Sequence, residues 1–397
     1  MLRKNPNIQY HPSYWLAALG AGGTSVSFFM YLMWLIPHPA TPIPTYADWH
    51  TQLIKGDLLA AITLFALIGV IIFALLHVLL LIWNIAESRQ HKAALQTLDN
   101  TPAELQKMAI PLTLAMTVNV FFILGALFVP GLWSVVEYLF PGAIFAFAII
   151  AYVASQQFTR YMSHMISDGG YRSQEHNHLS GLISVFTFAM LAVGFAAAAA
   201  MSHVAATVAI ATSFSLAFMI FAILLGILFL VKGITAMMQH GLSEPASPSI
   251  WMLIPILTLL AITWVRLSHG LSHHFKVESH AGQLFVPLSL LFTLQIGVLA
   301  LGYKVMKKNG YLTYYLHGDK ESPVSFGLIC PGVALFVMGM FWWHIGWVKT
   351  GIIDQFSAIY WLGIVVLLSV QIITILSLIK LTKKLLMHPL RQPLAQA

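Results

Sequence analysis

The chain has 397 residues, of which 59% are hydrophobic and only 8% are charged, and its mean hydropathy is +0.82. About a quarter of the residues of a soluble domain are charged, so this chain lacks the polar surface that a soluble protein of its length needs. We therefore expect a polytopic membrane protein that binds no nucleic acid, despite a net charge of +7. The single cysteine, Cys330, excludes an intrachain disulfide and a cysteine-based zinc site.

Ten apolar segments are long enough to cross a bilayer, which takes about 20 residues as a helix. Backbone polar groups in lipid must pair internally, so each segment is expected to be helical. The predicted spans lie near residues 13–36, 57–84, 109–131, 135–155, 178–200, 205–232, 249–268, 284–306, 326–348 and 354–380. No polar segment between them is long enough to bury a core of its own, so residues 1–397 form a single transmembrane domain.

The distribution of basic residues predicts the orientation. Alternate connections place only four of the 20 lysines and arginines on one side: Lys55, Arg266, Lys276 and Lys349. The other 16 mark the cytoplasmic side, which puts both termini in the cytoplasm. The outer connections are mostly short, which indicates five antiparallel helix hairpins.

Basic side chains gather at the predicted outer end of the seventh span. Arg266, His269 and His273 have the spacing of one helix face, and His274 follows them. In one interpretation Arg266 reaches to the interface and the histidines are solvated. In a second, the cluster is an outer vestibule that attracts anions more strongly as its histidines gain protons. In a third, His269, His273 and His344 bind a transition metal, since imidazole is a common ligand of such ions.

Three intramembrane features invite a structural or a functional interpretation. Pro331 and Pro255 predict kinks within the ninth and seventh spans. Cys330 is either a small buried residue or a reactive thiol. His77, deep in the second span, either serves a functional site or bonds to a neighbouring helix.

Residues 266–275 (RLSHGLSHHF) and 330–334 (CPGVA) resemble the TsoY family of membrane (seleno)proteins. The ten spans in five hairpins resemble the wider tellurite-resistance/dicarboxylate transporter superfamily, which includes the plant slow anion channels. The resemblance implies an inner ring of odd-numbered helices around a pore, an outer ring of even-numbered helices and a homotrimer in the bacterial inner membrane. It also implies an aromatic plug on the ninth helix, at Phe336 or Phe341, and a selenocysteine in some members at the position of Cys330.

The leading functional hypothesis is a channel or transporter in the lipid bilayer that moves a small anion without a cofactor. The resemblance adds sulfur or selenium oxyanions as substrates. The predicted substrate-binding residues are Arg266, His269, His273, His274 and Cys330. The chain carries no nucleotide-binding, zinc-protease or serine-hydrolase motif, which favours transport over catalysis.

The alternative is a membrane oxidoreductase subunit or a metal-binding protein that uses the histidine-rich outer segment and Cys330. His77 is predicted near the cytoplasmic end of its span, whereas His269, His273 and His344 lie toward the outer surface. Two haem ligands must face each other at one depth, so this mismatch counts against haem.

Overall fold

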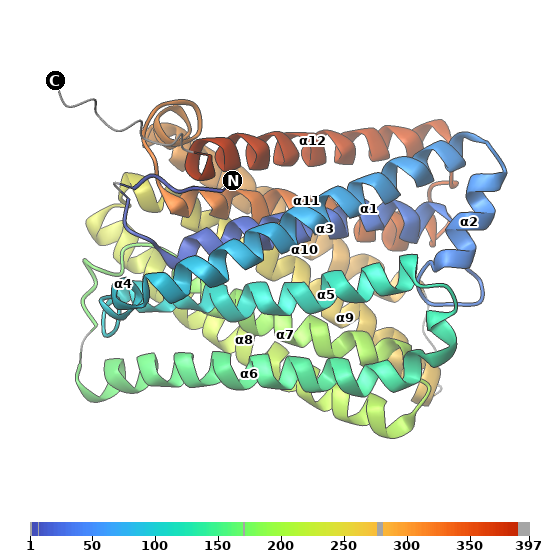
Figure 1. Ribbon diagram of the computed structural model, residues 1–397, viewed down its shortest axis with the longest axis horizontal. Helices are drawn as coiled ribbons and strands as arrows, with labels where there is room; N and C mark the ends of the chain where they lie inside the picture. Colours follow the sequence, from blue (N-terminus) through green and yellow to red (C-terminus); the bar gives the residue numbers. More distant parts are fainter. Residues whose placement is uncertain (1, 7, 170, 276–280, 388–397) are drawn as a thin grey trace.

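The computed structural model describes residues 2–6, 8–169, 171–275 and 281–387, except for the side chains of residues 273–275 and 281. Over these residues the chain is helical, and ten helices are long and apolar enough to cross a membrane. They lie side by side with their long axes roughly aligned (Figure 1). The all-helical class and the number of spans agree with the sequence prediction, and they indicate a multi-pass membrane protein.

The ten helices are named from their order in the chain. Those at odd positions, the odd spans, are α1 (Trp15–Leu35), α5 (Ala109–Phe128), α7 (Leu182–Met201), α9 (Leu253–Phe275) and α11 (Ile329–Phe341). The even spans are α3 (Leu58–Gln90), α6 (Val136–Ser167), α8 (Ala205–His240), α10 (Ala281–Lys308) and α12 (Ala358–Leu386). Two short helices, α2 (Tyr46–Ile54) and α4 (Lys92–Gln96), lie at opposite ends of the bundle (Figure 1).

Several helices run further than their apolar segments predict. Helix α6 ends at Ser167 and α8 at His240, whereas the predicted spans end near residues 155 and 232. An α-helix satisfies its backbone hydrogen bonds internally, so it continues into the headgroup region and water after the apolar residues end. Hydropathy therefore locates the part of a helix that lipid covers, not the end of the helix.

Three odd spans begin in the same way. A 3-10 helix leads into each of α5, α9 and α11: Pro102–Met108, Glu244–Met252 and Pro323–Leu328. The third residue of each α-helix is then a proline: Pro111, Pro255 and Pro331. Proline fits the first turn of an α-helix because the N–H groups there have no partner within it. Pro255 and Pro331 thus lie just after the change from 3-10 to α geometry, and the kinks expected at them stay predictions.

Consecutive spans contact each other in pairs: α1 with α3, α5 with α6, α7 with α8, α9 with α10, and α11 with α12. The odd spans also contact one another. Helix α1 touches α5, α5 touches α7, α7 touches α9, α9 touches α11, and α11 touches α1. The helix pairs are therefore linked chiefly through their odd members.

Burial distinguishes three of the odd spans from four of the even spans. In the most apolar stretch of α1, α7 and α11, at least 78% of the residues are buried, against at most 28% for α6, α8, α10 and α12. Helices α3, α5 and α9 are intermediate. Large apolar side chains are exposed along the even spans, as in Ile72, Phe145, Leu224 and Leu376. Such a surface is compatible with lipid and not with water.

The two ends of the described chain meet. The backbone N–H of Arg3 donates to the carbonyl oxygen of Leu386 over 2.6 Å, and Arg3 and Met387 form an isolated parallel bridge. The bridge puts the start of the chain and the end of α12 at the same end of the bundle (Figure 1), as an even number of spans requires.

Candidate functional site

A cavity of about 170 Å³ lies among the odd spans. Side chains from all five of them line it, and residues of α6 and Ile43 complete the wall. Phenylalanine, methionine, valine, leucine and alanine make up most of the lining. Among the described lining residues, Arg266 is the one that carries a charge.

Arg266 lies on α9 and is partly buried. Its Nη1 donates to the carbonyl oxygen of Val193 on α7 over 2.8 Å. A guanidinium has five N–H donors, so this bond leaves four of them without a protein acceptor among the described residues. No described carboxylate forms an ion pair with Arg266. Within the described part of the chain, the side chain therefore faces the cavity and α7 with no carboxylate against its charge.

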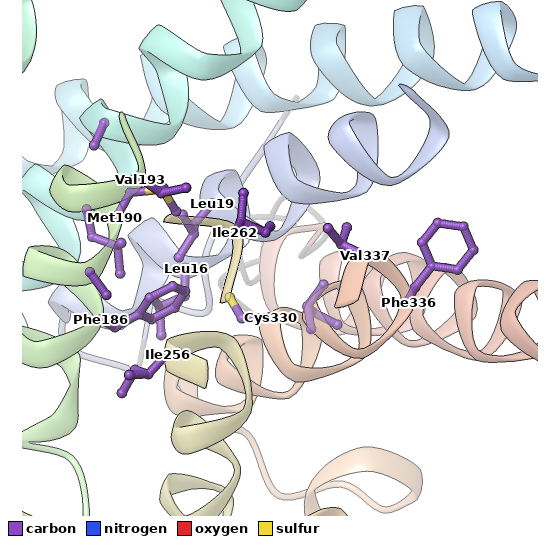
Figure 2. Close-up of a cluster of buried hydrophobic side chains, with 14 of the residues drawn as sticks. Leu16, Leu19, Phe186, Met190, Val193, Ile256, Ile262, Cys330, Phe336 and Val337 are labelled. Atoms are coloured by element: carbon purple, nitrogen blue, oxygen red, sulfur yellow. The ribbon is translucent and has the colours of Figure 1, made fainter. Parts of the chain in front are cut away.

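Cys330 reaches the same cavity from α11. The face of that helix which lines the cavity carries Cys330, Val333, Ala334 and Val337. These residues are three or four positions apart, so they share one side of the helix. Figure 2 shows Cys330 among buried side chains of α1, α7 and α9. The structure thus brings together two of the predicted binding residues, Arg266 and Cys330, from spans that lie far apart in the sequence.

The two predicted gate residues face α1. Phe336 is fully buried, and its ring centroid lies 5.6 Å from that of Tyr31. Figure 2 shows it apart from Cys330 and the side chains around it. The ring of Phe341 lies 5.3 Å from that of Trp34. Neither phenylalanine is among the described residues that line the cavity, and a gate on this helix stays a prediction.

The glycines of α1 allow α11 to approach closely. A Cβ atom on Gly20 would lie 2.8 Å from Cγ2 of Ile329, and one on Gly23 would lie 3.0 Å from Cγ1 of Val333. Both glycines also line the cavity. The same two glycines therefore let α1 pack closely on α11 and form part of the cavity wall, because small residues allow two helices to approach each other.

The predicted histidine cluster is described only in part. His269 lies partly buried on α9 and is not among the cavity-lining residues. The side chains of His273 and His274 fall outside the described residues, as does the whole of His280. Over the part of the chain that the structure describes, no group of three His, Cys, Asp or Glu residues is placed to hold a metal ion. A metal bound by His269 and His273 stays a prediction.

His344 already has partners for both ring nitrogens. Its Nδ1 lies 2.8 Å from the carbonyl oxygen of Met340, and its Nε2 lies 2.9 Å from the hydroxyl of Tyr360. The ring also stacks on Trp34, with centroids 4.9 Å apart. Metal binding by His344 would have to displace one of these contacts.

His77 is fully buried between α1, α3 and α5, and both its nitrogens have protein partners. It is not among the described lining residues of the cavity. Of the two sequence interpretations, a hydrogen bond to a neighbouring helix matches this geometry.

Sequence reasoning missed several cavity residues, notably Asn119, Phe122 and Met190. The amide of Asn119 donates from Nδ2 to the sulfur of Met190 over 3.5 Å, across the contact between α5 and α7. A carboxamide in the middle of an apolar span was a usable signal, because polar residues inside a membrane are rare and tend to be functional. Phe122 and Met190 gave no such signal among so many apolar neighbours.

The fold and cavity therefore define an all-helical, multi-pass membrane protein with a cation in a largely apolar cavity. No protein-family model matches the chain, and no curated protein matches it.

Proposed function

We propose that the protein is a channel or transporter of the bacterial inner membrane that moves small anions between the odd spans. The observation that carries the proposal is Arg266, a fixed cation in a cavity that all five odd spans line. A guanidinium stays protonated and offers a planar fork of donors that matches oxyanions. An ionisable side chain inside a membrane protein is expensive to place there, which makes a functional role the first hypothesis.

In this proposal the odd spans form an inner ring around the path and the even spans form an outer ring. The contacts from α1 through α5, α7, α9 and α11 back to α1 support the ring. The lower burial of α6, α8, α10 and α12 supports an outer position for these four. The proposal also keeps both termini in the cytoplasm, which places Arg266 toward the outer end of the path.

Three finer features rest on the resemblance alone and remain predictions. They are an aromatic gate at Phe336 or Phe341, assembly as a homotrimer, and sulfur or selenium oxyanions as substrates. The contribution of His269, His273 and His274 to a pH-dependent outer vestibule is likewise proposed.

Anion uptake into proteoliposomes tests the proposal. A panel of chloride, sulfite, selenite and benzoate would be compared for the parent, Arg266→Gln and Arg266→Lys. We expect Arg266→Gln to lower uptake of the transported anion at least tenfold, and Arg266→Lys to be intermediate because it keeps the charge and loses the fork. Arg172→Gln is the matched control, since Arg172 is exposed and pairs with Glu175 outside the cavity. Equal uptake by the parent and Arg266→Gln, with normal insertion, would contradict the proposal.

Cysteine accessibility tests the ring separately. In a Cys330→Ala background, single cysteines would replace Met116 and Val193 on odd spans and Ile220 and Leu376 on even spans. A charged, membrane-impermeant thiol reagent enters a hydrated path and not lipid, so we expect it to label the first pair only. Equal labelling of both pairs would reject the ring.

A further inference from the structure

We infer that the anion which binds beside Arg266 is an organic monocarboxylate with an apolar body about the size of a benzene ring, rather than a bare inorganic oxyanion. The inference rests on the proposed function and narrows its substrate class.

The first argument is the charge of the site. Arg266 is the one charged side chain among the described lining residues, and no described carboxylate pairs with it. One guanidinium balances one negative charge. A second charge on the ligand would have to be buried without a partner, which disfavours binding. The site therefore favours a monoanion.

The second argument is the chemistry of the remaining wall. Phe29, Phe122, Phe186, Met190 and Val337 offer no hydrogen bonds to an anion. The Thr258 hydroxyl donates to the carbonyl oxygen of Ala334, and Asn119 uses one of its two N–H groups on the sulfur of Met190. Among the described lining side chains, this leaves an anion the second N–H group of Asn119 and the weakly donating Cys330 thiol besides Arg266. An inorganic oxyanion needs donors around its whole surface to replace its water, whereas a carboxylate on an apolar body needs them at one end.

The third argument is size. The cavity measures about 170 Å³. A cavity of about 150 Å³ lined by leucine, isoleucine and phenylalanine stays dry and binds benzene, so an apolar ring fits here with its carboxylate directed at Arg266. Acetate would leave most of the apolar wall uncovered. Phenylalanine and methionine side chains also suit such a body, because methionine adapts its shape and its sulfur contacts aromatic rings favourably.

Binding to the purified full-length protein in nanodiscs, measured by isothermal titration calorimetry, tests the inference. Four probes separate the contribution of the ligand's negative charge from that of its apolar body: benzoate, acetate, benzyl alcohol and selenite. We expect benzoate to bind at least tenfold more tightly than acetate, which lacks the apolar body, and than benzyl alcohol, which lacks the charge. Selenite should bind no better than acetate.

Two variants assign the binding to this cavity. Arg266→Gln should bring the affinity for benzoate down to that for benzyl alcohol. Ala197→Phe fills the space beside Val193 on the cavity face of α7 and leaves Arg266 in place, so it should abolish binding of benzoate while the protein remains folded. Arg172→Gln should bind benzoate like the parent, which controls for the loss of a positive charge elsewhere on the protein.

The outcomes distinguish the inference from the proposed function. Selenite or acetate binding as tightly as benzoate, with loss in Arg266→Gln, would overturn the inference and leave the anion pathway standing. Benzoate binding that depends on Arg266 without any benzoate uptake would support the inference and count against transport. Benzoate binding that neither variant changes would overturn the inference, because the ligand would then lie elsewhere.

Discussion

His77 of α3 and Thr117 of α5 lie with Nε2 and Oγ1 3.0 Å apart in the interior of the bundle. On the other side of the ring, Nδ1 is 2.7 Å from the carbonyl oxygen of Ala18 on α1. A carbonyl oxygen only accepts, so Nδ1 carries a proton, whereas Nε2 contacts a hydroxyl that also lies 2.9 Å from the carbonyl oxygen of Thr113. One imidazole thus joins three helices.

Replacing His77 should therefore weaken the bundle. We expect His77→Ala to lower the free energy of unfolding by about 1–3 kcal/mol, from two lost interhelical hydrogen bonds and a small cavity. His50→Ala is the matched control, because His50 is exposed on α2 and should leave the stability unchanged. The thermal midpoint in detergent, followed by tryptophan fluorescence, measures both variants. An unchanged midpoint for His77→Ala would contradict this role.

Replacement by alanine should have opposite effects on stability at a tightly packed glycine of α1 and at an open glycine of α6. Gly20→Ala should cost about 1–3 kcal/mol, because its Cβ would lie 2.8 Å from Ile329. Gly142→Ala on the exposed face of α6 meets nothing within 4 Å and should be neutral or gain up to about 1 kcal/mol from helix propensity. The thermal midpoints of the two variants, each compared with that of the parent, measure these changes in stability.

A double variant tests the contact itself. Ile329→Ala removes the methyl group that Gly20→Ala would meet, so the two changes together should cost less than the sum of the single variants. Strict additivity would show that Gly20 acts in some other way.

The position of the aromatic side chains predicts which of them controls the path. Phe122 lines the cavity, so Phe122→Ala should widen it and raise anion flux. Phe336 is fully buried against α1, so Phe336→Ala should cost about 3–5 kcal/mol of stability with no rise in flux. Anion flux per inserted protein in proteoliposomes checks the flux predicted for each of the two variants. Higher flux in Phe336→Ala alone would instead favour the gate that the resemblance places on the ninth helix.

His11 predicts a dependence of stability on pH. The backbone N–H of Ser13 donates to its Nδ1 over 3.2 Å, and burial lowers the pKa of His11 to about 4. The ordinary pKa is about 6.5, so below that value the unfolded chain binds a proton that the folded chain does not. The stability that His11 contributes is therefore complete above pH 6.5 and is lost as the pH falls toward 4.

The comparison with His11→Asn isolates this effect. Asparagine keeps an oxygen acceptor for Ser13 and does not titrate in this range. We expect the thermal midpoint of the parent, followed by tryptophan fluorescence, to fall relative to that of His11→Asn between pH 6.5 and 4. A constant difference across this range would rule out the contribution of His11.

Hydropathy was enough to predict the spans, because each apolar segment is long and separate. It was not enough to predict which side of each helix turns inward. A soluble helix shows its buried side by contrast with a polar one, but here lipid and interior are both apolar. Phe336 and Val337 are neighbours in one apolar run, and only the second lines the cavity. Arg266 and Cys330 stood out because their chemistry is rare in such a chain.

The order of synthesis leaves the cavity until last. Gly20 and Gly23 emerge from the ribosome roughly 300 residues before Ile329 and Val333, which they contact. Helices α1, α3 and α5 can join early through His77, but the glycine face of α1 has no partner until α11 has inserted. Contacts between such distant segments form slowly, and an N-terminal part folds before the rest is made. A ribosome that stalls before the ninth span therefore leaves a membrane-inserted bundle whose binding site does not exist.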